Sequence, residues 1–230
     1  MRIAVFGANG QTGRLLTQQV LDAGHDAVAV TRKPAGFPLS GERLRVAEAD
    51  AHHPADVAAA VAGADAVISV LGVPMGLRRI DTYSVAAQNI VKAMADSGIR
   101  RLIAVSSTAV ATYPGRTGAP LALKFVEPVL KTSIGRTTYA DQRAMEAVVS
   151  GCGLDWTVVR PSGLFDLDHV TEYVAGKVDP VGAFTSRTDL AHYLLALAQT
   201  SGPNSRVTIS TVADTPTLWQ MVRREAFASA

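Results

Sequence analysis

The sequence holds a single cysteine, Cys152. One thiol cannot form a disulfide within its own chain, and this is typical of proteins from a reducing compartment. Long apolar runs are also missing. None approaches the ~20 residues that a membrane-spanning helix needs, and the residues after Met1 lack the apolar core of a signal peptide. We therefore expect a cytoplasmic protein with no membrane partner.

An excess of one charge sign is lacking as well. The chain has 22 Lys and Arg against 20 Asp and Glu, and its positive residues are scattered. This distribution does not favour a nucleic-acid partner. No group of His, Cys and carboxylate residues has the spacing of metal ligands, so we expect no metal. The G-x-S-x-G turn of α/β-hydrolases is absent, which excludes that class.

What the sequence has in abundance is apolar residues, at 48% of the chain. Apolar runs of strand length alternate with segments of helical spacing, which predicts right-handed βαβ crossovers. We expect an α/β fold: a Rossmann-type, doubly wound, mostly parallel sheet with helices on both faces, in one domain over residues 1–230. The predicted strands are 3–6, 27–30, 45–47, 66–71, 102–105, 156–159 and 207–210. The predicted helices are 14–23, 56–62, 84–97, 139–150 and 188–200, the last with Ser186 as its N-cap.

One stretch, residues 111–138, follows no period and is rich in proline and glycine. It is long for a connection in a compact domain, and such segments often bind ligands or cover a site. Residues 121–130 within it are compatible with a short amphipathic helix. We expect this stretch, together with residues 164–187, to form the substrate side of the domain.

The glycine-rich stretch GANGQTG, residues 7–13, lies between the first strand and the first helix. Glycines also serve ordinary turns, but a strand, a glycine turn and a helix N-terminus inside a βαβ unit predict a phosphate site. Gly7 permits the tight turn, Gly10 lets a pyrophosphate approach the backbone, and Gly13 lets the helix pack close to the strand. The turn adds Asn9, Gln11 and Thr12 as candidate cofactor-binding residues.

The second strand ends in Thr31-Arg32-Lys33, where a site for NAD usually has an acidic residue. Two cations suit a 2′-phosphate, so Arg32 and Lys33 favour NADP(H) over NAD(H) as the cofactor. The alternative is a solvated basic turn. Asp50 follows the third strand and is a candidate contact for the adenine; its alternative role is a helix cap.

Several segments resemble a known family: GANGQTGR, VTRKP, EADAHHPADVAAAVAGADAVISVLG, AAQNIVKAMADSGIRRLIAVSSTAV and ADQRAMEAVVSGCGLDWTVVRPSGL. They resemble atypical short-chain dehydrogenase/reductases, of the flavin reductase/biliverdin reductase B branch of NmrA-like NAD(P)H-binding proteins. The resemblance implies that residues 7–13 hold the pyrophosphate and Arg32 the 2′-phosphate. It assigns Asp50 and Ala51 to the adenine, Leu71, Gly72 and Val73 to the ribose, and Pro161, Ser162 and Gly163 to the nicotinamide.

The catalytic residues are harder to place. Short-chain dehydrogenases usually carry a Tyr-x-x-x-Lys pair, and the candidate here is Tyr139 with Arg143, whose guanidinium holds its proton. Counting back from Met145, the family's usual Lys or His position falls instead on Gln142. A structural role for Tyr139 and Arg143 is the alternative. Ser106, Ser107 and Thr108 follow the fifth strand at the ligand-binding edge: Ser106 is a candidate cofactor contact, Ser107 and Thr108 are candidate catalytic residues, and a strand-end cap is the alternative.

Three functions stay open. The first is an NADPH-dependent oxidoreductase that reduces a flavin or another flat conjugated acceptor by hydride transfer. The second is a non-catalytic NADP(H) sensor that acts through a protein partner, and the third is a carbonyl reductase or epimerase of secondary metabolism. The absence of Tyr-x-x-x-Lys counts against carbonyl reduction, which needs a proton donor at the oxygen. We expect a small-molecule acceptor as partner and a monomer or homodimer.

Overall fold

The computed structural model describes residues 1–74, 76, 78–120, 132–133, 135–200, 202–217 and 220. The strands of its main sheet are β1 (Arg2–Phe6), β2 (Asp26–Thr31), β3 (Leu44–Glu48), β4 (Ala66–Ser69), β5 (Arg101–Val105), β6 (Asp155–Pro161), β8 (Tyr173–Gly176) and β10 (Ser205–Thr211). Two further strands, β7 (Gly163–Phe165) and β9 (Phe184–Ser186), form a small parallel sheet. The helices are α1 (Gln11–Asp22), α2 (Pro54–Val61), α3 (Thr82–Asp96), α5 (Arg136–Ser150) and α6 (Arg187–Gln199), with a 3-10 turn at Thr108–Val110.

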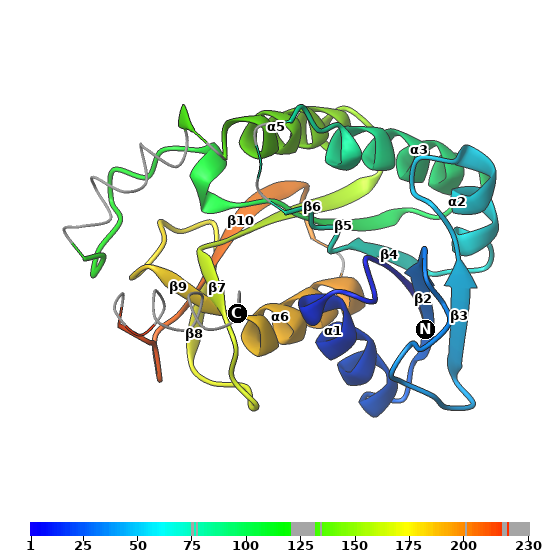
Figure 1. The fold of residues 1–230 in the computed structure, drawn as a ribbon, viewed down its shortest axis with the longest axis horizontal. Coiled ribbons are helices and arrows are strands. Elements are labelled where there is room, and N and C mark those ends of the chain that lie inside the picture. The colour runs from blue at the N-terminus through cyan, green and yellow to red at the C-terminus, as the bar shows by residue number, and fades with distance from the viewer. Residues whose placement is uncertain are drawn as a thin grey trace.

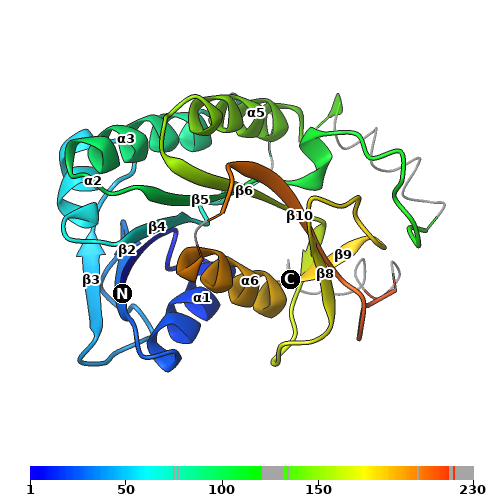
Figure 2. The ribbon, with the colours of Figure 1, turned by 180° about the vertical axis from the view of Figure 1, so that it is seen from behind.

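The main sheet lies between two layers of helices, as Figures 1 and 2 show. The strand order is β3-β2-β1-β4-β5-β6-β10-β8. All neighbouring pairs are parallel except β10 and β8, which are antiparallel. Helices α1 and α6 cover one face of the sheet, and α2, α3 and α5 cover the other. The chain therefore has the predicted Rossmann-type, doubly wound architecture.

The buried core explains why the central strands are continuous apolar runs. Ile3, Ala4, Val5 and Phe6 of β1 are at most 1% exposed, because helices cover both of their faces. Alternate residues of the strand belong to the two cores. Ala4 and Phe6 pack toward α2 and α3, while Ile3 and Val5 pack toward α1 and α6.

The predicted elements are confirmed, with shifted ends and three omissions. Helix α1 begins at Gln11 rather than at residue 14, because Gly10 is already its N-cap. Ser186 caps α6 as predicted, and its side chain accepts bonds from the N–H groups of Thr188 and Asp189. Strands β7, β8 and β9 were not predicted, since three or four residues are too few to show a period. The helix proposed for residues 121–130 lies outside the described residues.

None of the described helices combines the length and the apolar composition needed to cross a lipid bilayer.

Candidate cofactor and acceptor site

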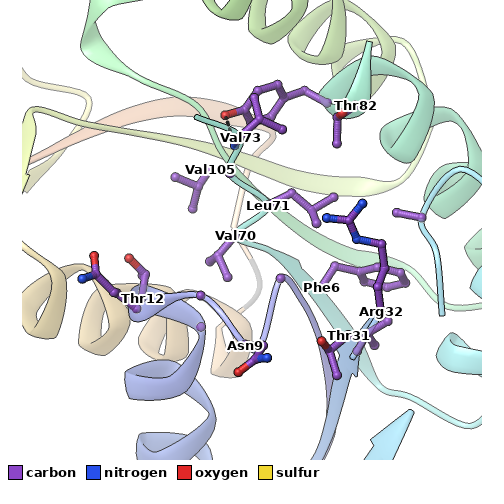
Figure 3. A pocket seen from close by; sticks show the side chains of 18 of the residues that line it. Phe6, Asn9, Thr12, Thr31, Arg32, Val70, Leu71, Val73, Thr82 and Val105 are labelled. Carbon is purple, nitrogen blue, oxygen red and sulfur yellow. Dashed lines mark hydrogen bonds between the residues drawn. The ribbon is translucent and has the colours of Figure 1, made fainter. Parts of the chain in front are cut away.

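A cavity of about 430 Å³ lies at the carboxyl ends of β1, β2, β4 and β5. This is the edge at which doubly wound sheets bind their ligands. Figure 3 shows residues that line it, with Thr12 on one side, Arg32 on the opposite side and Val70 and Leu71 between them. We call the lining residues at the carboxyl ends of β1, β2 and β3 the turn side (7, 9–13, 31–32 and 49–52). We call Tyr83, Gln142, Leu164, Arg187 and Leu190 the helix side.

The three glycines of the turn side differ in what they make possible. Gly7 has a φ of +82°, and a Cβ there would lie 2.8 Å from the carbonyl oxygen of Val70. A Cβ on Gly13 would lie 2.2 Å from the carbonyl oxygen of Gly7, so this glycine permits close packing of α1 on β1. A Cβ on Gly10 would approach only the Gly7 oxygen, at 3.3 Å. Gly10 is therefore the glycine that leaves room for a ligand.

The N-terminus of α1 opens into the cavity, and Gln11, Thr12 and Gly13 of its first turn line the wall. The N-cap is Gly10, which has no side chain to cap this end, and no acidic residue stands in the first turn. Its N–H groups and the helix dipole therefore remain available to an anion. Asn9 is held in place by Arg14, whose Nε and Nη2 both donate to the Asn9 Oδ1, at 3.1 and 2.7 Å.

Only one of the two predicted 2′-phosphate cations lines the cavity. Arg32 points into it from the end of β2, whereas Lys33 is exposed and outside the wall. Asp50 also lines the cavity, and it is not the cap of α2, whose N-cap is His53. The Asp50 carboxylate accepts a hydrogen bond from the His52 backbone N–H and forms a second one with the His52 ring. These bonds, the backbone one most, hold the pKa of the Asp50 carboxyl below its usual value.

The middle of the cavity is built from the loops after β4 and β5. Leu71, Gly72 and Val73 line it, as do Ala51 and Ser106. The Val73 N–H donates to the Tyr83 hydroxyl, at 3.2 Å. The predicted ribose segment therefore lies beside Tyr83, a residue that no sequence motif pointed to.

Tyr83 and Gln142 are brought together by a buried carboxylate. Asp141 of α5 accepts bonds from the Tyr83 N–H at 2.8 Å and from the Ser84 N–H at 3.3 Å, and so caps the start of α3. Burial raises the pKa of Tyr83 above its usual value, although the Val73 N–H acts in the opposite direction. The Gln142 side chain lines the cavity, and its Oε1 is buried without a hydrogen-bond partner in the described part of the chain. A buried orphan acceptor of this kind indicates a place for a ligand donor.

The four predicted catalytic residues lie outside the cavity wall. Ser107 is the N-cap of the 3-10 turn, and its Oγ accepts a bond from the Ala109 N–H at 3.1 Å. Thr108, in that turn, is 5% exposed. Tyr139 is 8% exposed while Arg143, one turn further along α5, faces solvent. Although the i, i+4 spacing puts Tyr139 and Arg143 on neighbouring positions of the helix, the first is buried and the second is exposed.

The predicted nicotinamide segment lies next to the wall rather than on it. Pro161 ends β6 and Gly163 begins β7. Between them, the Ser162 N–H donates to Thr185 Oγ1, at 3.0 Å. The next residue, Leu164, lines the cavity.

Two parts of the predicted substrate side contact each other. The Gly115 N–H donates to the Asp179 carboxylate at 2.6 Å, and Arg116 Nε donates to the Gly182 carbonyl at 3.0 Å. The Gly182 N–H donates to the Thr117 carbonyl, at 2.7 Å. Residues 115–117 and 179–182 are therefore joined, although neither stretch lines the cavity.

A second buried carboxylate, Glu146 of α5, joins this helix to two arginines of the sheet. Glu146 accepts a bond from Arg160 Nε at 2.9 Å and one from Arg206 Nε at 3.0 Å. Arg160 Nη1 also donates to the Tyr113 hydroxyl, at 3.3 Å. Burial alone would raise the pKa of Glu146, but the bonds and charge of Arg160, with Arg206, outweigh it and lower the pKa.

Sequence reasoning missed much of the wall. The lining residues that it did not single out as site residues are Phe6, Val30, Thr31, Ala49, His52, Val70, Thr82, Tyr83, Val105, Gln142, Leu164, Arg187 and Leu190. The sequence did point to Gln142, since the position that usually holds Lys or His in the resembled family falls on this residue. Leu164 and Arg187 are the two ends of the stretch 164–187 that was predicted to form the substrate side, although neither residue was singled out within it.

The comparison with protein families agrees with this geometry. A family model described as NAD(P)H-binding matches residues 7–201. The chain belongs to this NAD(P)H-binding family. The residues present fit such a cofactor, because an uncapped helix N-terminus, a glycine that leaves room for phosphate and an orphan acceptor line one cavity.

Solved structures share the fold. A wide-type short-chain dehydrogenase/reductase from Veillonella parvula, in complex with NADP, has a TM-score of 0.76 and 21% identity, covering 94% of this chain and 99% of that one. ChuY from Escherichia coli O157:H7, described as an anaerobillin reductase, has a TM-score of 0.73 and 21% identity, covering 94% and 100%. At these identities the likeness shows the fold alone.

Two curated relatives are similar in sequence, and both are named as uncharacterized. A protein of Bacillus subtilis named uncharacterized sugar epimerase YhfK is 28% identical over 223 residues, which are 94% of this chain and 96% of that protein. The uncharacterized protein Rv2047c of Mycobacterium tuberculosis is 30% identical over 166 residues. That match covers 72% of this chain but only 15% of the mycobacterial protein.

Proposed function

We propose that the protein is an NADPH-dependent oxidoreductase that reduces a flavin or another flat conjugated acceptor. The observation that carries the proposal is one continuous cavity. It joins the N-terminus of α1 to a part of the wall in which the apolar residues Val105 and Leu164 are partly exposed. The first part suits the phosphates of a dinucleotide, and the second suits a flat ring.

The cofactor preference rests on Arg32. Its guanidinium lines the cavity beside Asp50, and the residue after it is Lys33 rather than an acid. A guanidinium pairs strongly with a phosphate, whereas NAD(H) would present only hydroxyls there. This favours NADPH over NADH.

Positioning is the main contribution we assign to the chain. When bound, NADPH supplies the hydride. The turn side holds the phosphates and Gln142 offers Oε1 to a donor of the ligand. The apolar wall orients a flat ring and excludes water. Correct orientation of two reactants can supply ~7–11 kcal/mol of a barrier without an acid or a base.

Two comparisons support the reductase proposal. The chain belongs to an NAD(P)H-binding family, and ChuY, which shares its fold, is described as a reductase of an anaerobillin. The Tyr139 and Arg143 pair lies outside the cavity wall, which agrees with a reaction in which water supplies the proton.

The test is NADPH oxidation with FMN or riboflavin, under anaerobic conditions so that reduced flavin accumulates. Turnover supports the reductase. Micromolar or tighter NADPH binding with no turnover on the flavins or on any other flat conjugated acceptor would contradict it and favour the sensor.

Sugar epimerisation is the second candidate, because the Bacillus relative carries that name. An epimerase returns the hydride to its substrate, so NADPH absorbance would stay constant. A change in sugar configuration, followed by NMR with a nucleotide sugar, would identify this reaction.

A further inference from the structure

The helix side of the cavity carries a cation, Arg187, to which the proposed reduction assigns no role. Arg187 is the first residue of α6 and lines the cavity with Leu164 and Leu190. Leu190 is fully buried. Arg187 therefore lines the same cavity as Leu164, in the part that we assign to the acceptor.

Arg187 retains most of its hydrogen-bonding capacity. Its Nη1 donates to Asp166 Oδ1, at 2.8 Å, and Asp166 is the only hydrogen-bond partner of this guanidinium among the described residues. The Arg187 side chain is 19% exposed and that of Asp166 is 63% exposed. A pair with so exposed a carboxylate is weak, and a guanidinium has five donors. A ligand anion can therefore bind beside Asp166 or replace it.

The other positive features of the wall have different positions. Arg32 follows β2 on the turn side, and the N-terminus of α1 faces the glycine turn. The N-terminus of α6 is already capped by Ser186. The positive charge that α6 offers is consequently the Arg187 side chain rather than the helix end.

We propose that Arg187 forms an anion-binding subsite for the acceptor and selects flat conjugated molecules that carry a phosphate or carboxylate group. The inference deepens the proposed function and rests on it. Leu164, which is partly exposed in the cavity, contacts the ring, and the guanidinium binds the anionic group attached to it.

FMN and riboflavin test this directly, because they share the ring system and differ by one phosphate. We expect wild type to have a kcat/KM about tenfold to a hundredfold higher for FMN, as charge-assisted bonds to an anion suggest. Arg187→Gln should remove that preference by raising the KM for FMN. Its kcat/KM for riboflavin and its Kd for NADPH should change by less than about threefold.

Two control variants sharpen the result. Arg100, just before β5, is an exposed arginine that pairs with Asp155. Arg100→Gln should leave the kcat/KM values for FMN and riboflavin unchanged. Asp166→Asn removes the competing carboxylate, and should lower the KM for FMN without changing that for riboflavin.

Binding to the NADP⁺-saturated protein, followed by quenching of flavin fluorescence, separates this inference from the proposed function. Tighter binding of FMN that depends on Arg187, without turnover, keeps the subsite and rejects flavin reduction. Equal affinity of wild type for the two flavins, or binding of neither, overturns the subsite. A tenfold loss of NADPH affinity in Arg187→Gln also overturns it, because Arg187 would then bind the cofactor.

Discussion

The turn side and the helix side line one cavity but are assembled differently. On the turn side, three short stretches at the ends of neighbouring strands supply the wall. On the helix side, the wall consists of side chains from α3, α5, β7 and α6, which lie more than 100 residues apart at the extremes, from Tyr83 to Leu190. The first depends on local chain geometry, and the second depends on how distant elements pack.

This difference shows in what holds each side in place. Gly7 lets the turn pack closely on the backbone of Val70, and Gly13 lets α1 pack closely on the backbone of Gly7. Asp141 and Glu146 secure the helix side, by capping α3 and by joining α5 to Arg160 and Arg206. Substitutions on the turn side should therefore act on cofactor binding, and those on the helix side on the acceptor and on stability.

The largest effect is expected from the glycine turn. Gly10→Val should abolish measurable binding of both NADPH and NADH, because its branched side chain would occupy the place of the pyrophosphate. The fold should survive, because a Cβ at this position would meet only the Gly7 oxygen, at 3.3 Å. Gly13→Val should instead destabilise the fold by about 3 kcal/mol, since its Cβ would overlap the Gly7 oxygen. Fluorescence titration and thermal unfolding measure the two effects.

Gly41→Val is the matched control, because a Cβ there meets nothing within 4 Å. Normal NADPH binding by Gly10→Val would show that the phosphates lie elsewhere.

The support of the helix side should respond to acid. Glu146→Gln should destabilise the fold near neutral pH by about 3 kcal/mol, because it leaves Arg160 without its partner. The pKa of Glu146 in the folded state lies below its usual value of 4.5, so the stabilisation is present above that pH and is lost as the pH falls through the lowered value.

Urea unfolding of wild type and Glu146→Gln across this range measures the difference, which should shrink in acid. Asp155→Asn, in an exposed pair with Arg100, should cost less than about 1 kcal/mol. A difference that is constant with pH would mean that Glu146 is not the titrating group.

Arg32 tests the selectivity of the turn side. Arg32→Ala should weaken NADPH roughly tenfold to a hundredfold and leave NADH nearly unchanged, because only NADPH carries the 2′-phosphate. Lys33→Ala should have the smaller effect, since Lys33 is outside the cavity wall. Equal losses for the two cofactors would refute the assignment. Isothermal titration measures both affinities.

The smallest effects compare two tyrosines. Tyr83 lines the cavity and Tyr139 does not, so Tyr83→Phe should lower kcat/KM for the acceptor by about tenfold and Tyr139→Phe by only about threefold. Steady-state kinetics with saturating NADPH measures both. A thousandfold loss in kcat for Tyr139→Phe, with cofactor binding intact, would restore it as the proton donor and favour carbonyl substrates.

The sequence by itself determined the alternation of strands and helices, the doubly wound fold and the turn side of the cavity. The physical reason is that these features are local in the sequence. Gly7, Gly10 and Gly13 lie within seven residues, Arg32 directly follows β2, and Asp50 lies two residues after the end of β3. Only the tertiary structure decided which residues complete the cavity. Tyr83 and Gln142 meet because Asp141 caps a helix nearly 60 residues earlier in the chain, and Arg187 reaches the wall because α6 packs beside α1. No local pattern records such contacts, since the partners are neighbours only after the sheet has brought its helices together.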